Sequence, residues 1–191
     1  MGFEKLILIN AKLFSSVVNL GKGLRMESAL AVANFFVDQS LNTGEELTPI
    51  KLIKLVYISH GWHLAAKDDE LLSEAVEAWQ YGPVVPSVYH KFKAYGNGQI
   101  KAFANEVHGQ SFYVPKVNKE ETVNFLQEIW DQYKQYDGLQ LSTLTHLPDT
   151  PWHIVYNNPV NKAKKGVIIP NNLIKEHYKE KLNANRKALG I

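Results

Sequence analysis

The side chains here that could ligate a metal or move a proton are imidazoles and carboxylates, because the chain has seven histidines and no cysteine. His60 and His63 are three residues apart in a helical pattern, so both point to roughly one side. By helical angle, however, His60 falls on an apolar face, where a hydrogen-bonded core histidine explains it equally well. Zinc needs three or four converging ligands, and the spacing places no third one. We therefore expect no metal site and no cofactor.

A second pair that could do chemistry is His146 with Asp149, just before Pro151-Trp152. A His–Asp pair can transfer protons, so an enzyme that uses His146, Asp149 and His60 is one hypothesis. In the alternative, Asp149 caps or buttresses the turn while Trp152 fills the core. The sequence has no His-Glu-x-x-His, Gly-x-Ser-x-Gly or phosphate-binding Gly-rich pattern, and no nucleophile is identifiable. We therefore predict no catalytic residues and a protein that is not an enzyme.

An aromatic segment leading into a rigid turn has a different character; its residues are Trp79, Tyr81, Gly82, Pro83 and Val84. Aromatic side chains of this kind pack in a core by default. They also serve as anchors on a partner surface, because they supply a large contact area at low entropic cost. The residue types leave both interpretations open.

The elements that must position these residues are mostly helices. Helical patterns cover, in order, 28–38, 48–66, 86–96, 118–138, 142–147, a segment from 150 onward, and 172–182. Ser28 and Thr48 are expected N-caps, Asn118 and Glu121 have capping-box spacing, and Gly138 is expected to end the helix that they open. Alternating residues predict a strand over 75–81, ended by a Gly82-Pro83 turn, and short strands over 112–117 and 167–169.

These elements predict a mainly α (α+β) fold, a single compact helical domain with a small two- or three-stranded β element. Residues 1–25 form a separate amphipathic helix, since apolar residues from Phe3 to Leu20 occupy one half of it and Gly21-Lys22-Gly23 breaks it. We expect this extension to bury its apolar stripe against the body or against a partner, which includes a second copy of the chain. The domain proper is then 26–191, and both Met1 and Met26 remain candidate starts.

Composition restricts the partners and the location. With 191 residues, 45% hydrophobic and 21% charged, the chain is an ordinary globular sequence of net charge +2. This near-neutral charge argues against nucleic acid as a partner, and the basic stretch 162–165 is typical of a solvated loop. No apolar run approaches the roughly 20 residues of a membrane span, so we expect no membrane contact. Without cysteine there is no hint of secretion, and we expect a cytoplasmic protein.

Three motifs occur in a fixed order along the chain. The first is Leu47-Thr48-Pro49 with 51–57 and His60-Gly61-Trp62, the second is 77–85 with Val88-Tyr89, and the third is Leu141-Ser142, Thr145-His146 and Pro151-Trp152. In order and approximate spacing, over about residues 28–182, they resemble the Panacea (SocA-like) antitoxin domain family. The matching or adjoining positions carried forward are His60, Trp79, Tyr81, Gly82, Pro83, Val84, His146, Asp149 and Trp152.

The resemblance implies a mostly helical antitoxin from a bacterial or phage toxin–antitoxin pair, which neutralises a cognate protein toxin by direct contact. It also implies a processive protease as a further candidate partner, because the founding member is described as a proteolytic adaptor. It implies no catalytic residues. A regulator that binds its own promoter is a weaker alternative, which the near-neutral charge disfavours. The 1–25 extension lies outside the resemblance.

Overall fold

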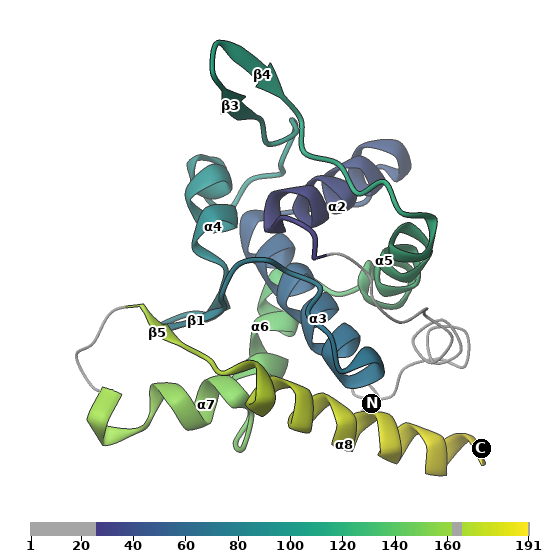
Figure 1. Cartoon of the computed structure of the whole chain (residues 1–191), viewed down its shortest axis with the longest axis vertical. Helices are drawn as coiled ribbons and strands as arrows, with labels where there is room; N and C mark the ends of the chain where they lie inside the picture. The colour runs from purple at the N-terminus through teal and green to yellow at the C-terminus, as the bar shows by residue number, and fades with distance from the viewer. Residues whose placement is uncertain (1–25, 162–165, 191) are drawn as a thin grey trace.

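The computed structural model describes residues 26–161 and 166–190 (Figure 1). Three expectations lie outside the described residues. They are the helix over 1–25, the solvated loop at 162–165 and the boundary between extension and domain. Within the described residues, no helix is both long enough and apolar enough to cross a membrane.

Helix α3, Pro49–Lys67, is the central element. It starts as predicted: the Thr48 hydroxyl accepts from Lys51 N at 3.5 Å, and Pro49 occupies the first turn, where its missing N–H costs no hydrogen bond. Its apolar side chains point in all directions, so the helix is stable only when other elements cover every side of it. Four other helices, α2 (Ala29–Thr43), α5 (Glu120–Tyr133), α6 (Gly138–His146) and α8 (Asn171–Leu189), pack around it and bury nearly its whole length.

The surrounding helices confirm the mainly α prediction. They are α2 (Ala29–Thr43), α4 (Pro86–Phe92), α5 (Glu120–Tyr133), α6 (Gly138–His146), α7 (Pro151–Tyr156) and α8 (Asn171–Leu189), with short 3-10 turns at Lys93–Tyr95 and Pro159–Asn161. Ser28 caps α2 as expected, since its hydroxyl accepts from Ala31 N at 3.1 Å. Helix α8 continues past the predicted end at residue 182.

The β element is a three-stranded antiparallel sheet of order β2-β1-β5. Its strands are β1 (Glu77–Trp79), β2 (Gly82–Val84) and β5 (Val167–Ile168). The expectation that Gly82-Pro83 forms the turn is wrong: the turn residues are 80 and 81, while Gly82 pairs with Trp79 and Pro83 pairs with Ala78. Proline is tolerated there because β2 is an edge strand, which needs no outward N–H.

A second hairpin, β3 (Glu106–His108) and β4 (Ser111–Tyr113), extends away from the helices at the top of Figure 1. Strand β3 falls in a weakly patterned stretch and was not predicted, and β4 ends earlier than the strand expected over 112–117. Both strands are short, and all three residues of β4 are exposed, so the hairpin lacks the clear alternation of buried and exposed residues on which strand prediction depends.

The predicted start signal and the predicted end of α5 are also wrong. Helix α5 begins after Lys119 without any side-chain cap, so Asn118 and Glu121 form no capping box. The capping box lies instead at α6, where Gln140 N donates to Asp137 Oδ1 at 2.8 Å and Asp137 N donates to Gln140 Oε1 at 2.9 Å. Gly138 therefore begins α6 and does not end α5.

Candidate functional site

The second and third sequence motifs meet at the β1–β2 hairpin. Trp152, in the first turn of α7, donates its indole N–H to the carbonyl of Trp79 on β1 at 2.7 Å. The ring of His146, at the end of α6, lies 4.0 Å from the ring of Trp152, and the ring of Tyr156 stacks on that of Trp152 at 4.7 Å. Residues more than 60 positions apart in the sequence are thus brought into one cluster.

Lys54 of α3 supplies the centre of this cluster. Its amine donates to the carbonyl of Tyr81 at 2.7 Å and to that of Pro83 at 3.3 Å, so it holds the last residue of the turn and the strand β2 that follows it. The side chain is only 1% exposed, and burial lowers the pKa of the amine to about 7. We call Lys54, Trp79, Gly82, Pro83, His146 and Trp152 the signature cluster.

Gly82 is the residue that lets this cluster close. Its φ of +105° lies where residues with a Cβ are strained. A Cβ there would also collide with the Lys54 amine and approach His146 Cε1 to 2.8 Å. The side chains of Lys54 and His146 approach the backbone of Gly82 so closely that only glycine fits at this position.

The hairpin turns one aromatic side chain outward and packs the other. Tyr81, in the turn, is 73% exposed. Trp79 is half-buried: its indole N–H donates to Glu77 Oε2 at 2.7 Å, and its ring meets Tyr89 edge-on at 4.9 Å. Val84 is buried in the core. Of the two interpretations of this segment, packing applies to Trp79 and Val84, and exposure leaves Tyr81 available to a partner.

The structure does not bring His146 and Asp149 together as a proton-transfer pair. His146 Nδ1 lies 2.6 Å from the carbonyl of Ser142, which can only accept, so Nδ1 carries the proton. Asp149 is exposed with a φ of +62°, and no hydrogen bond or ion pair among the described residues joins it to His146. Trp152 fills the core beside the turn, as the alternative interpretation expected.

His60 and His63 are fully buried and turn toward different partners. His60 Nε2 lies 3.0 Å from Asn171 Oδ1 of α8, whereas His63 Nδ1 lies 2.9 Å from the carbonyl of Asp69. Burial lowers the pKa of both imidazoles, which favours their neutral forms. In the described part of the chain, no three histidine, aspartate or glutamate residues are grouped so as to hold a metal ion.

Sequence reasoning missed Lys54, the residue that ties the hairpin to the central helix. The available signal was a lysine on a helix that is otherwise apolar almost all round, because such a residue must find buried acceptors. Lys51 gave the same signal, and its amine donates to the carbonyls of Lys134 at 2.5 Å and Glu46 at 3.0 Å.

Comparison with known proteins gives one family. The family model described as "Antitoxin SocA-like, Panacea domain" matches residues 52–153, just over half of the chain and a span that contains the whole signature cluster. The chain is 27% identical over 154 residues to a protein named Antitoxin SocA from Caulobacter vibrioides, which covers 79% of this chain and 82% of that protein. No solved structure matches.

Proposed function

The chain belongs to the SocA-like Panacea family of antitoxins, and on that basis we propose that it neutralises a protein toxin by binding to the toxin directly. The observation that carries the proposal is the contrast within the hairpin. Its backbone is held by hydrogen bonds from the buried side chains of Lys54 and Trp152, while the side chain of Tyr81 in its turn is 73% exposed.

A rigid hairpin favours binding, because ordering a mobile loop on contact with a partner costs conformational entropy. Two hydrogen bonds from Lys54 hold the backbone at Tyr81 and at Pro83, so the position of Tyr81 is fixed before a partner arrives. A tyrosine so placed offers an apolar ring and a hydroxyl, the combination found in residues that dominate protein interfaces. In this proposal the buried signature residues serve the scaffold, and Tyr81 makes contact with the toxin.

We further propose that binding itself blocks the toxin, in the cytoplasm where both proteins are made. Delivery of the toxin to a processive protease is the alternative mode, and the half-life of the toxin separates the two. Occlusion leaves that half-life unchanged or longer when the antitoxin is co-expressed. A shortened half-life that depends on the protease supports delivery instead.

The test of function is co-expression of the full chain with the product of the adjacent gene. We expect that product to arrest growth when expressed alone and the chain to restore growth. A harmless product, or one that stays toxic beside this chain, contradicts the proposal. A gel shift of the chain's own promoter at physiological salt examines the regulator alternative, and we expect none.

The contact residue is tested with two variants of Tyr81. In calorimetric titration with the purified toxin we expect Tyr81→Ala to weaken binding by about tenfold or more. Tyr81→Phe keeps the ring and should lie within about threefold of wild type. Both variants should keep the wild-type midpoint of thermal unfolding, since the side chain is largely exposed. Unchanged affinity of Tyr81→Ala removes the hairpin as the contact and leaves the antitoxin function standing.

A further inference from the structure

The β3–β4 hairpin and the residues next to it, 105–114, form an arm that leaves the body of the molecule (Figure 1). In its register Val107 lies directly opposite Phe112, so the two side chains share one face of the ribbon. Val107 is 63% exposed and Phe112 is 73% exposed. A paired aliphatic and aromatic side chain in solvent on a projecting hairpin is a feature of interaction surfaces.

The foot of the arm is fixed to the body by a buried asparagine. Asn34 of α2, 3% exposed, donates from Nδ2 to the carbonyls of Ala104 and Pro115, both at 2.9 Å. Its Oδ1 accepts from Ala104 N at 2.7 Å. The two ends of the arm are thus clamped to one side chain. Because a lone two-stranded hairpin is marginally stable in water, this clamp holds the arm in position.

The outer edge of β4 is open for backbone pairing. In a hairpin with a two-residue turn the flanking pair is hydrogen-bonded, so at the next pair, Val107 and Phe112, the N–H and C=O groups point to the two outer edges. On the β3 side, Lys91 of α4 donates to the carbonyl and side-chain oxygens of Asn105 and covers the foot. On the β4 side the described residues provide no further strand.

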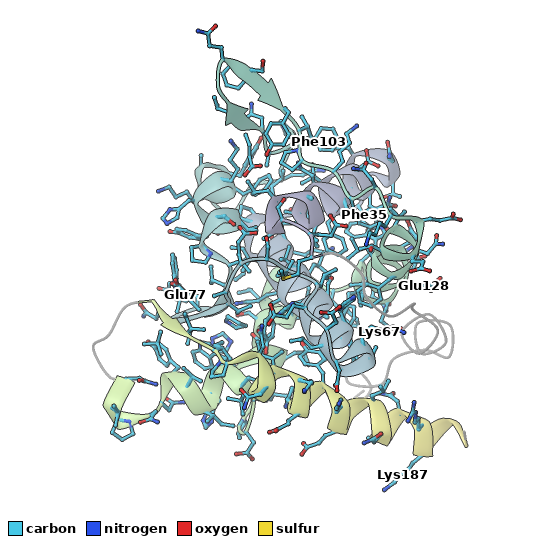
Figure 2. The ribbon with its side chains drawn as sticks, in the orientation of Figure 1. Phe35, Lys67, Glu77, Phe103, Glu128 and Lys187 are labelled. Atoms are coloured by element: carbon cyan, nitrogen blue, oxygen red, sulfur yellow. The ribbon has the colours of Figure 1, made fainter. Side chains whose placement is uncertain are left out.

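A shallow cavity of about 150 Å³ continues this edge toward the body. Its apolar lining comes from Phe103 and Val114 at the foot of the arm and from Phe35 and Val117 on the body. Figure 2 labels Phe35 and Phe103, which lie below the arm. The cavity has room for one apolar side chain of a strand that runs along β4.

The stretch of sequence that contains the arm is basic, although Asp38 of α2 also lines the cavity. The stretch 86–119, which includes α4, the arm and its foot, has five lysines against a single glutamate and no arginine, a net charge of +4 in a chain of +2. The lysines are Lys91, Lys93, Lys101, Lys116 and Lys119. The rest of the chain is therefore net negative, and a partner at the arm gains from acidic side chains.

We propose that the outer edge of β4 binds an extended segment of the toxin as a third strand, with acidic side chains toward these lysines and an apolar side chain in the cavity. This inference rests on the proposed function, because it takes the toxin as the partner. An open strand edge offers main-chain hydrogen bonds that a protein strand can make at every second residue. The exposed apolar pair, Val107 and Phe112, favours a protein strand as the partner over the phosphate backbone of a nucleic acid.

The edge is tested first with a labelled peptide and the full-length chain, by fluorescence anisotropy. The probe is a decapeptide in which acidic residues alternate with valine and phenylalanine. We expect it to bind, and a matched peptide with lysine in place of each acidic residue to bind at least about tenfold more weakly. Equal binding of the two peptides, or competition by a single-stranded DNA oligonucleotide at lower concentration than the peptide, overturns the proposal.

Three variants then locate the site. Phe112→Ser should weaken peptide binding by about tenfold, and Lys116→Glu by about fivefold, with the second effect shrinking at high salt. Lys187→Glu makes the same charge change on α8, at the lower right of Figure 2 and far from the arm, and should bind as wild type does. Phe112 and Lys116 are exposed, so circular dichroism should show all three variants folded. Unchanged binding by Phe112→Ser overturns the assignment.

The toxin experiment keeps this inference separate from the proposed function. If wild type restores growth and Phe112→Ser does so with unchanged toxin affinity, the arm is not the contact and the antitoxin function stands. If the variant loses rescue together with about tenfold in affinity, both are supported. If wild type fails to restore growth, the proposed function and the toxin as occupant fall together, and the peptide titration alone decides whether the edge binds acidic strands.

Discussion

Lys54 places an amine among neutral oxygens, with the carbonyls of Tyr81 and Pro83 as its partners. Burial disfavours the charged amine, which is why its pKa falls to about 7, but a neutral amine can still donate to both carbonyls. An apolar replacement would remove the desolvation cost and leave two buried acceptors unpaired, at about 1–3 kcal/mol each. The residue is therefore suited to positioning the hairpin and not to maximising stability.

This environment makes a prediction about pH. The pKa of Lys54 is about 7 in the folded chain and near 10.5 when unfolded, so between these values the unfolded state binds more protons and stability rises with pH. Below pH 7 both states are protonated, and this contribution to the slope disappears. Relative to Lys54→Met, wild type should gain roughly 2 kcal/mol in free energy of unfolding between pH 7 and pH 9, as measured by urea titration.

The comparison with the variant is essential, because Lys181 also has a lowered pKa, about 8, and contributes a slope of the same sign to both proteins. Parallel curves for wild type and Lys54→Met across this range would show that the Lys54 amine is solvated in solution and does not hold the turn as described.

Among the elements, the starts of α2 and α3 were predicted from nearby residues, whereas the start of α6 was missed although its capping box, Asp137 with Gln140, is also local. Ser28 and Thr48 cap their helices because the acceptor and its N–H lie three residues apart. Gly138 signalled a helix end, yet it begins α6. The residue is glycine because a Cβ there would collide with Ile50 and approach Lys51 N to 2.9 Å. That constraint comes from α3, nearly 90 positions earlier, and has no local signal.

The same distinction holds for the site. Trp79, Gly82, His146 and Trp152 could be singled out by type and by their order in the motifs, and the structure brings them together. Their centre, Lys54, was missed: a lysine on a helix that is apolar almost all round signals buried acceptors, but these acceptors are carbonyls that carry no side-chain signature. Strand β3, and with it the hairpin of the arm, was missed for a related reason: the exposed apolar residues of the arm do not alternate with buried ones.

A pair of alanine variants tests the corrected helix boundary. Asp137→Ala removes the side chain that accepts from Gln140 N at 2.8 Å and should lower the free energy of unfolding by about 1 kcal/mol. Asn118→Ala alters an exposed residue outside α5 and should change it by less than about 0.5 kcal/mol. Denaturant melts of the two proteins give the comparison, and a larger loss from Asn118→Ala would restore the sequence-based boundary.

At the scale of the whole molecule, α8 returns from the end of the chain to cover α3, which carries the first motif. The contact is close: the ring of Tyr178 lies against Gly61, edge-on to Trp62 at 5.1 Å and to Tyr57 at 6.1 Å. Figure 1 shows α8 below the lower end of α3, and the two helices pack against each other. Asn171 Oδ1 at the start of α8 also lies 3.0 Å from His60 Nε2, so a side-chain contact joins the central helix to the C-terminal one.

Two kinds of contact join α8 to α3, and their magnitudes predict which one matters. At Gly61, alanine gains about 1 kcal/mol in helix propensity, but its methyl group collides with the fully buried ring of Tyr178. Overpacking typically costs about 1–3 kcal/mol, and a rigid ring between two helices belongs at the upper end, so Gly61→Ala should destabilise by roughly 1–2 kcal/mol net. The measurement is the denaturant midpoint of the full chain.

Asp68, at the end of α3, makes the contrasting contact, an exposed ion pair with Lys179 at 2.5 Å and with Lys175 at 3.7 Å. Asp68→Asn removes the charge while keeping a residue type that accepts the left-handed φ of +59° found there. Because exposed pairs are screened by water and salt, the midpoint should not move measurably at physiological ionic strength. A shift larger than that of Gly61→Ala would mean that charge, and not close packing at the glycine, attaches α8 to the rest of the molecule.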